Sequence, residues 1–240
     1  MISVVIPVYN EAGCLQAHVE SLSAILTDLA GDAWEIVLVD DGSRDETPGE
    51  LAVLARNPQV SVQTHPENRG KGAAVRTGVM ATRGDMVLFC DADMSTPPET
   101  LGEFKAALDE GADVVVGNRK SAAADIQRWQ PPLRTWLGLG FTRLANWMTG
   151  LSISDYTCGF KLFRGEAARR VFEATETPGW SFDVEVLARV AREGLSVREI
   201  PVRWHHVDDT RVRIARDVIR SFLELLSIRR RLGRFRKGAD

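Results

Sequence analysis

The sequence contains little cysteine and no long apolar run. Its 240 residues include three cysteines, Cys14, Cys90 and Cys158, with no C-x-x-C spacing. Such an odd and sparse set argues against a disulfide framework or a zinc ribbon and fits a reducing cytoplasm. The first seven residues lack a basic region and are too short for a signal peptide. Charges interrupt every stretch that approaches the roughly 18 apolar residues of a membrane span, so any membrane contact is expected to be peripheral.

Neither sign of charge dominates the whole chain. There are 30 basic and 33 acidic residues, and the net charge is -3. This balance disfavours a protein that binds nucleic acid over its whole surface. The distribution is uneven, because residues 211–240 carry ten basic and three acidic side chains, a local +7 that leaves −10 on the other 210 residues. A basic tail of this kind indicates an anionic partner, such as a membrane surface.

Two common phosphate-binding signatures are missing. The chain has no Walker A pattern G-x-x-x-x-G-K-[ST], and no G-x-G-x-x-G follows its first predicted strand, which disfavours a nicotinamide oxidoreductase. A sugar nucleotidyltransferase would carry a glycine-rich loop with Arg and Lys at that place, where this chain reads P-V-Y-N-E over 7–11. A phosphate-receiver domain also clusters acids at strand ends, but it would account for only about half of the length.

Apolar, β-branched runs alternate with helical patterns, as in a parallel sheet covered by helices. The predicted strands are 2–8, 35–39, 60–63, 86–90, 114–117, 160–163 and 196–203. The predicted helices lie near 13–29, 47–56, 71–82, 98–109, 165–174 and 182–193, with an aromatic-rich helical stretch inside 129–150. A final helix carries Ile214, Val218, Phe222 and Leu225 at helical spacing. No linker rich in glycine or serine divides the chain, and there is no internal repeat.

Acidic residues follow the fourth predicted strand, at the edge where parallel sheets bind ligands. Asp91 and Asp93 come directly after the apolar run 86–90. Their oxygens suit Mg²⁺ or Mn²⁺, which could bridge them to a diphosphate. D-x-D is also common in solvated acidic turns, so both interpretations stay open on this pattern alone.

Two further polar loops precede predicted helices. Residues 40–43 read D-D-G-S, where a carboxylate could accept a hydrogen bond from a nucleobase and the glycine permits close approach of a ligand. Ser43 or Asp45 is explained equally well as a helix N-cap. Residues 68–72, N-R-G-K-G, supply two cations and two glycines before a helix, which makes them a candidate diphosphate clamp.

The motifs follow one another in a fixed order. They are V-V-I-P-V-Y-N-E at 4–11, V-D-D-G-S at 39–43, N-R-G-K-G-A-A-V-R-T-G at 68–78, D-A-D at 91–93 and G-N-R at 117–119. Together they resemble an inverting family 2 glycosyltransferase with a GT-A fold. S-D-Y-T-C-G-F-K-L-F-R at 154–164 and W-S-F-D-V-E-V-L at 180–187 resemble the dolichyl-phosphate glucosyltransferase and dolichyl-phosphate mannose synthase branch, the glucosyl type more closely. The resemblance implies an α/β fold with a mostly parallel central sheet flanked by helices and an amphipathic C-terminal helix.

The resemblance also implies a role for each matching residue. The nucleotide-sugar site would comprise Pro7, Tyr9, Glu11, Asp41 at the base, Lys71 at the phosphates, and Asp91, Ala92 and Asp93, with Asp91 and Asp93 on a divalent cation, Mg²⁺ or Mn²⁺. The catalytic set would be Asp93, Asp155, Arg119 and Arg134, the two arginines holding an acceptor phosphate. Arg211 stands in a Thr-Arg pair where relatives carry Ser-Lys, which makes it a third candidate for the acceptor phosphate.

A phosphate acceptor changes what Asp155 is expected to do. A phosphate monoester is already anionic near neutral pH, so it needs placement and charge neutralisation more than a strong base. Asp155, at the position that other family 2 enzymes use as a base, is therefore expected to orient the sugar or the acceptor. Trp180 is expected to pack, Asp183 to cap a helix or brace a loop, and His18 and His65 to lie at the surface.

The implied reaction moves a hexose, most simply from UDP-glucose, to a polyprenyl or dolichyl phosphate. GDP-mannose and UDP-N-acetylhexosamine are alternative donors, and a soluble or polysaccharide acceptor or a non-catalytic nucleotide-sugar sensor are alternative functions. One domain is expected over 1–240, with a nucleotide-sugar half (1–120), an acceptor half (121–210) and a basic helix and tail (211–240). The protein is expected in the cytoplasm, where this helix would bind it peripherally to the cytoplasmic face of a membrane. No nucleic-acid partner is expected, and a homo-oligomer stays open. The aromatic stretch 129–150 fits either a core or an interfacial surface.

Overall fold

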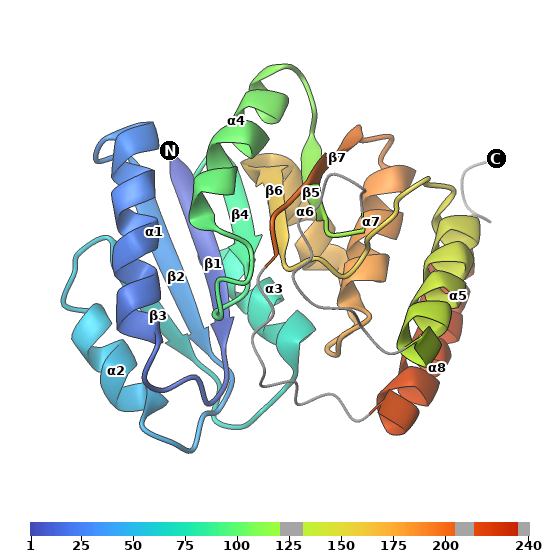
Figure 1. Cartoon of the computed structure of the whole chain (residues 1–240), viewed down its shortest axis with the longest axis horizontal. Coiled ribbons are helices and arrows are strands. Elements are labelled where there is room, and N and C mark those ends of the chain that lie inside the picture. Colours follow the sequence, from blue (N-terminus) through green and yellow to red (C-terminus); the bar gives the residue numbers. More distant parts are fainter. Residues whose placement is uncertain (121–131, 205–213, 235–240) are drawn as a thin grey trace.

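Figure 1 shows the computed structural model of the chain. The structure describes residues 1–120, 132–204 and 214–234; within the helices, the side chains of 132–137, 214–222 and 234 lie outside this description. The fold is a single mixed sheet with helices packed on both of its faces (Figure 1).

Seven strands of the described chain form the sheet in the order β3-β2-β1-β4-β6-β5-β7. Their bounds are β1 Ile2–Val8, β2 Trp34–Asp40, β3 Val60–Thr64, β4 Met86–Cys90, β5 Val114–Asn118, β6 Phe160–Arg164 and β7 Val197–Pro201. All pairings are parallel except those of β6, which runs antiparallel to both β4 and β5. The mostly parallel sheet predicted from the sequence is confirmed.

The helices agree closely with the predicted ranges. They are α1 Leu15–Ala30, α2 Thr47–Leu54, α3 Lys71–Ala81, α4 Leu101–Asp109, α5 Pro132–Thr149, α6 Gly165–Ala174, α7 Phe182–Arg192 and α8 Ile214–Arg234. A short 3₁₀ turn, Pro98–Thr100, precedes α4, and Pro98 suits its first position because the N–H that proline lacks would have no partner there. The sequence pattern therefore predicted where each of these elements lies to within a few residues.

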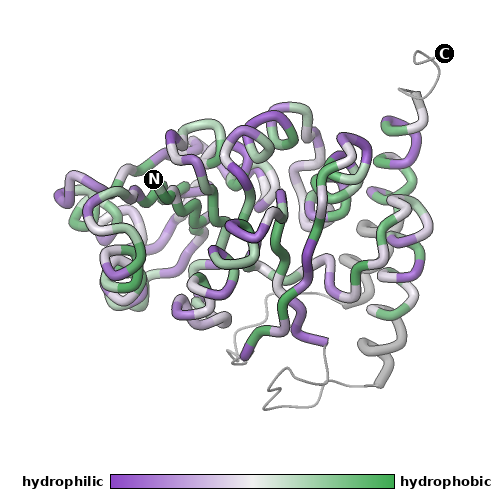
Figure 2. The backbone as a smooth tube through the Cα atoms, turned by 90° about the horizontal axis from the view of Figure 1, so that it is seen from above, coloured by the Kyte–Doolittle hydropathy of each residue, from purple (hydrophilic) through white to green (hydrophobic). Residues whose placement is uncertain are grey.

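Alternating side chains of the strands build two cores, one on each face of the sheet. In β1, Val4 and Ile6 pack against α1, α2 and α4, whereas Val5 packs against the opposite layer. That opposite layer holds α3, α5, α6, α7 and α8. Figure 2 shows apolar stretches along the central strands, between the more polar helices. The two cores fix the strands, and therefore fix where the loops after the strands emerge.

Helices α5 and α8 pack against each other at one end of the molecule, away from α1 and α2 (Figures 1 and 2). Leu225, Ile228 and Leu232 of α8 are buried at helical spacing, while Leu223 and Leu226 are exposed. Of the four apolar residues at helical spacing in the sequence, Leu225 lies on the core side, and the side chains of Ile214, Val218 and Phe222 lie outside the described residues. Among the described residues, no helix combines the length and apolarity needed to cross a membrane.

Candidate functional site

The loops that follow β1 and β2 are joined by hydrogen bonds. The backbone N–H of Asn10 donates to Oγ of Ser43 at 2.9 Å, and the N–H of Glu11 donates to Oγ1 of Thr47 at the same distance. Asn10 adopts a left-handed φ of 53°, which turns the chain sharply after β1. The segment 7–11 is thereby fixed beside the loop that carries Asp41. Ser43 serves this link rather than capping α2, whereas Asp45 accepts the N–H of Thr47 in the first turn of that helix.

Asp41 is buried at the end of β2 and organises the loop that leads into α3. Its Oδ1 lies 2.7 Å from Nδ1 of His65 and accepts the N–H of Arg69 at 2.9 Å, and its Oδ2 accepts the N–H of Gly70 at 2.8 Å. Nε2 of His65 is also 2.9 Å from Oγ1 of Thr77. The expectation that His65 lies at the surface is wrong: it is 5% exposed, because its two ring nitrogens bridge a strand end and a helix.

Gly70 permits a close contact between the start of α3 and a distant loop. Its φ is 100°, and a Cβ at this position would overlap the carbonyl oxygen of Pro178. The same carbonyl accepts the N–H of Ala73 at 3.3 Å. The loop before α7 therefore packs directly on the N-terminus of α3, where backbone N–H groups favour anions.

Lys71 is the cation at this helix start, and it points to the acidic loop after β4. Its Nζ lies 2.6 Å from Oδ1 of Asp91. Burial alone would lower the pKa of Lys71, but the charges of Asp91 and Asp183 outweigh burial and raise it, so the side chain is an ammonium at neutral pH. The ring of Trp180 lies 4.9 Å from the same Nζ and is 59% exposed. Trp180 is thus an exposed aromatic at the site, not the packing residue that the sequence predicted.

Asp91 and Asp93 stand at the carboxyl end of β4, as predicted. Oδ1 of Asp93 accepts the N–H of Ser95 at 2.9 Å, and the buried Ala92 between them accepts a hydrogen bond through its carbonyl from Nδ1 of His18 at 2.8 Å. His18, half-buried rather than at the open surface, thereby ties α1 to this loop.

The two carboxylates fit a divalent cation in part. They offer only oxygen ligands, and Oδ1 of Asp91 is buried with no hydrogen-bond donor in the described part of the chain apart from its ion pair with Lys71. No group of three or more His, Cys, Asp or Glu within the described ranges could hold a metal alone. A cation on Asp91 and Asp93 would therefore complete its coordination with water or with a ligand, as Mg²⁺ commonly does with phosphate oxygens.

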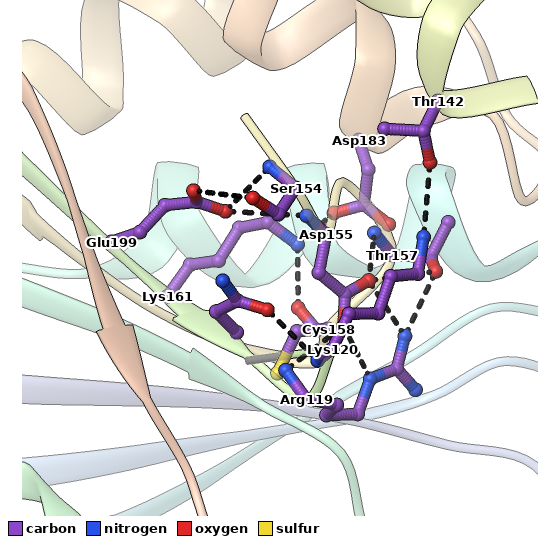
Figure 3. A network of polar contacts seen from close by, with 11 residues as sticks. Arg119, Lys120, Thr142, Ser154, Asp155, Thr157, Cys158, Lys161, Asp183 and Glu199 are labelled. Carbon is purple, nitrogen blue, oxygen red and sulfur yellow. Dashed lines mark hydrogen bonds and ion pairs between the residues drawn. The ribbon is translucent and has the colours of Figure 1, made fainter. Parts of the chain in front are cut away.

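Arg119 and Asp155 form the other charged pair of this region (Figure 3). Nε and Nη2 of Arg119 donate to Oδ2 and Oδ1 of Asp155 at 2.7 and 2.9 Å, and Nη2 also donates to Oγ1 of Thr157 at 2.9 Å. Asp155 is fully buried and Arg119 is partly exposed. Burial would raise the pKa of Asp155, but the hydrogen bonds and the charge of Arg119 outweigh it and hold that pKa well below its ordinary range. Asp155 is therefore a weak base.

Glu199 of β7 and Lys120 fix the surroundings of this pair. Oε1 of Glu199 accepts the N–H groups of Ser154 and Asp155 at 2.8 and 3.2 Å, and Oε2 accepts Oγ–H of Ser154. Lys120 donates to Oγ1 of Thr142 in α5 at 2.9 Å. Glu199 and Arg119 thus hold the loop at 154–157 from two sides, while Lys120 links the segment after β5 to α5 (Figure 3).

A short turn connects the two charged pairs. After Asp155 the chain reaches Gly159, whose carbonyl accepts the N–H of Asp91 at 3.0 Å. A Cβ at Gly159 would overlap the carboxylate of Asp91. Burial would lower the pKa of Arg119, but the hydrogen bond and the charge of Asp155 outweigh it and raise that pKa, and the charge of Asp91 adds a smaller contribution. The carboxylate–lysine group at 71 and 91 and the arginine–carboxylate group at 119 and 155 consequently belong to one site.

A family model, "Glycosyl transferase family 2", matches residues 3–172, most of the chain and nearly the whole of this site. The chain belongs to glycosyl transferase family 2. It is 34% identical over 248 residues to the dolichyl-phosphate beta-glucosyltransferase of Saccharomyces cerevisiae, covering 95% of this chain and 74% of that protein. It is 31% identical over 224 residues to the dolichyl-phosphate beta-glucosyltransferase of Homo sapiens, covering 88% of this chain and 69% of that protein.

Solved structures show the same GT-A fold for this family 2 glycosyltransferase. Glucosyl-3-phosphoglycerate synthase from Mycobacterium tuberculosis, in complex with phosphoglyceric acid, gives a TM-score of 0.68 at 22% identity, covering 95% of this chain and 79% of the other. Mannosyltransferase PcManGT from Pyrobaculum calidifontis, in complex with GDP-Man and Mn²⁺, gives a TM-score of 0.60 at 20% identity, covering 88% and 57%.

Two predicted residues of the glycosyltransferase cannot be placed in the site. Arg211 lies outside the described residues, and so does the side chain of Arg134, whose backbone is in the first turn of α5. The structure brings together Lys71, Asp91, Arg119 and Asp155. The position of Asp93 beside Asp91 follows from the same loop.

The sequence pattern missed three residues that build the site. No site role was predicted for Lys161, which lies in the motif at 154–164, or for Glu199 and His65, yet each bonds a loop of the site. A lysine inside the apolar strand F-K-L-F was the one available signal, since lysine is almost never fully buried unless it is paired. Asp183 braces a loop, as one of its two predicted roles, because it pairs with Lys161.

Proposed function

We propose that this glycosyltransferase moves glucose from UDP-glucose to the phosphate of a polyprenyl or dolichyl phosphate, with inversion at the anomeric carbon. The observation that carries the proposal is the pairing of an Asp91–Lys71 group with an Arg119–Asp155 group across one turn. Two anionic substrates must meet in such a reaction, and each group offers one of them a cation. The relatives at 31–34% identity carry the matching name, dolichyl-phosphate beta-glucosyltransferase.

The donor would bind on the Asp91 side. Pro7, Tyr9 and Glu11 would line the nucleotide pocket, and Asp41 would lie at the base, where it already shapes the loop 65–70. Lys71 and the N–H groups at the start of α3 would face the diphosphate. Asp91 and Asp93, with Ala92 between them, would hold Mg²⁺ or Mn²⁺, and the cation would stabilise the charge of the leaving diphosphate.

The acceptor phosphate would bind on the Arg119 side, with Arg134 and Arg211 as further cations. Asp155 would act by orientation, because its low pKa and its two hydrogen bonds from Arg119 suit it to hold that guanidinium in position. The phosphate oxygen needs no deprotonation at neutral pH, so charge neutralisation and alignment of the two substrates would account for the acceleration of the reaction.

The end of the molecule formed by α5 and α8 would rest on the cytoplasmic face of a membrane. Among the described side chains of these helices, four large apolar ones are exposed: Leu139 at 41%, Trp147 at 63%, Leu223 at 62% and Leu226 at 50%. The guanidinium of Arg229 lies 4.0 Å from the ring centroid of Trp147. Aromatic and leucine side chains beside arginines suit the headgroup region of an anionic bilayer. The three free cysteines suit a reducing compartment.

A donor panel tests the reaction. The protein is incubated with a short polyprenyl phosphate, Mg²⁺ or Mn²⁺, and radiolabelled UDP-glucose, GDP-mannose or UDP-N-acetylglucosamine, with Asp93→Ala as the control. Label from UDP-glucose should enter the lipid extract with wild type and not with the variant. If only GDP-mannose gave transfer, the donor would be GDP-mannose and not UDP-glucose. If sugar reached only a soluble or polysaccharide acceptor, the acceptor would not be a prenyl phosphate. Absence of any transfer across the panel would favour a nucleotide-sugar sensor.

A further inference from the structure

Lys161 is a charged residue in the interior of the molecule. It lies in β6 and is 1% exposed. Its Nζ donates to the carbonyl oxygen of Cys158 at 2.6 Å and to Oδ1 of Asp183 at 2.5 Å (Figure 3). Asp183 belongs to the first turn of α7 and is 4% exposed. The pair thus joins a strand, a helix and the turn before that strand.

Stability of the fold is a poor explanation for this pair. The cost of removing two charges from water can exceed their attraction, and apolar residues of similar volume often replace a buried ion pair without loss of stability. Burial raises the pKa of Asp183 even though the charges of Lys161 and Lys71 act to lower it. The ionised pair is therefore held at a cost, which points to a role in the adjacent site.

The turn that Lys161 holds is the one that contacts Asp91. Cys158, whose carbonyl accepts from Lys161, immediately precedes Gly159, whose carbonyl accepts the N–H of Asp91. Gly159 also lies so close to the Asp91 carboxylate that no Cβ fits between them. A shift of the Cys158 carbonyl would therefore move the surface on which the Asp91 carboxylate rests.

The pair also lies near the cation of the donor side. Nζ of Lys161 and Nζ of Lys71 lie 5.7 and 5.3 Å from the ring centroid of Phe89, at the end of β4. The negative charge of Asp183 acts on Lys71 as well as on Lys161. Lys161 and Asp183 are thus in a position to influence both members of the Lys71–Asp91 pair.

We infer that Lys161 and Asp183 are positioning residues: by fixing the Cys158 carbonyl they hold Gly159 against Asp91 and orient that carboxylate toward the metal–diphosphate group of the donor. Neither residue touches the substrate. The inference rests on the proposed function in one respect, the binding of a metal–nucleotide at Asp91, and it can be tested by binding as well as by turnover.

Two double variants separate the hydrogen bond from the charge. Lys161→Gln/Asp183→Asn is uncharged but keeps an amide at position 161 that can donate to the Cys158 carbonyl, whereas Lys161→Met/Asp183→Asn has no donor at position 161. A third variant, Glu35→Gln/Arg83→Met, removes the charges of a partly buried pair at the opposite edge of the sheet and serves as the control. Each is measured for urea unfolding, for the Kd of UDP with Mn²⁺ by calorimetry, and for kcat and KM of transfer.

The Met variant should weaken UDP–Mn²⁺ binding or lower kcat by about 10- to 100-fold, the range typical of residues that support metal ligands. The Gln variant and the Glu35 control should stay within about threefold of wild type. Equal effects in the Met and Gln variants, or loss of cooperative unfolding in both, would overturn the inference. A wild type that binds UDP–Mn²⁺ but transfers no sugar would contradict only the proposed function, and the binding comparison would still decide the inference. A wild type that binds neither UDP–Mn²⁺ nor GDP–Mn²⁺ would contradict both.

Discussion

Asp155 remains ionised at any pH at which the enzyme would work. Arg119 donates two hydrogen bonds to its carboxylate, and these, with the charge of Arg119, outweigh the effect of burial on its pKa. A carboxyl whose pKa is lowered on folding contributes stability above its unfolded pKa of about 3.9 and loses this contribution as the pH falls through its folded pKa. Between pH 5 and 9 neither the stability nor the rate should report its titration.

Asp155→Asn should lower kcat by less than about 100-fold, the smallest loss usual for removal of a general base. Asn keeps one oxygen that can accept from Arg119, so the guanidinium should stay near its position. The measurement is kcat for transfer to polyprenyl phosphate from pH 5 to 9, with the Kd values of donor and acceptor alongside. If turnover were lost completely while ligand binding and the stability of the fold stayed as in wild type, the orienting role would be contradicted.

Gly159→Ala should reduce kcat/KM by roughly 100-fold, because a Cβ would displace the Asp91 carboxylate and small misplacements in a site can cost that much. The matched control is Gly49→Ala in α2, where nothing lies within 4 Å of the added Cβ. The control should keep its activity and match or exceed wild type in stability, since alanine favours a helix. Equal activities of the two variants would show that Gly159 has no such role.

At the residue scale, the sequence predicted those side chains that follow apolar strands. Asp91, Asp93 and Asp41 follow β4 and β2 directly, and the topology of a parallel sheet brings strand ends together. Lys161 and His65 could not be found in this way, because their roles depend on partners 22 and 24 positions distant in the chain, contributed by other elements. The exposure of Trp180 depends likewise on how the loop 175–181 lies on α3.

At the element scale, α8 is anchored to the loop that contacts the donor side. Nη2 of Arg231 donates to Oγ1 of Thr177 at 2.6 Å and lies 3.4 Å from Oε2 of Glu185. Thr177 itself donates to the same carboxylate, and the next residue, Pro178, packs on Gly70. The basic C-terminal helix and the start of α3 are therefore connected through one loop.

Arg231→Met should lower the free energy of unfolding by about 1–3 kcal/mol, the usual cost of a hydrogen bond lost from a buried charged group. Burial alone would raise the pKa of Glu185, but the hydrogen bonds from Thr177 and Arg189 outweigh burial, and the net effect is a lowered pKa. The contribution of Glu185 is then present above its unfolded pKa of about 4.3 and is lost as the pH falls through its folded pKa.

Urea unfolding at several pH values checks this prediction. The difference in the free energy of unfolding between wild type and Arg231→Met should be constant from pH 8 to 6 and should become smaller below about pH 4.3. Arg230→Met, at the neighbouring exposed position, should stay within about 0.5 kcal/mol of wild type. An equal loss in both variants would show that the contact of Arg231 with the loop adds no stability.

The exposed apolar face of α5 and α8 gives a second prediction at this scale. Trp147→Ser/Leu226→Ser should weaken binding to vesicles containing anionic lipid by about 10-fold or more, because each side chain loses apolar area that the bilayer would cover. Val53→Ser, at an exposed apolar position of α2, is the control and should bind as wild type does. Vesicle flotation measures the bound fraction of protein. Equal binding by Trp147→Ser/Leu226→Ser and by Val53→Ser would show that these exposed side chains of α5 and α8 do not contact the membrane.

The elements themselves were largely predictable from the sequence. β4 and β5 are short apolar runs, and α6 and α7 have apolar residues at helical spacing, so local pattern was sufficient. The antiparallel direction of β6 and its insertion between β4 and β5 were not predicted, since strand order depends on long-range packing.

At the scale of the whole molecule, charge and fold fit a reaction between two anions at a surface. The basic tail 211–240 follows a body with an excess of acidic residues, and the sheet places acidic and basic pairs at one edge. The division into donor and acceptor halves at 1–120 and 121–210 stays a prediction, because β6 and β7 of the second half complete the sheet of the first.

The anomeric configuration and linkage of the product test the proposed reaction most directly. Product formed from UDP-glucose and polyprenyl phosphate is extracted and examined by proton and phosphorus NMR. We predict a glucosyl group whose anomeric carbon is bonded to an oxygen of the prenyl phosphate in the β configuration, the inverse of the α-linked donor. An α-linked product, free glucose alone, or glucose on a group other than the phosphate would contradict the proposal.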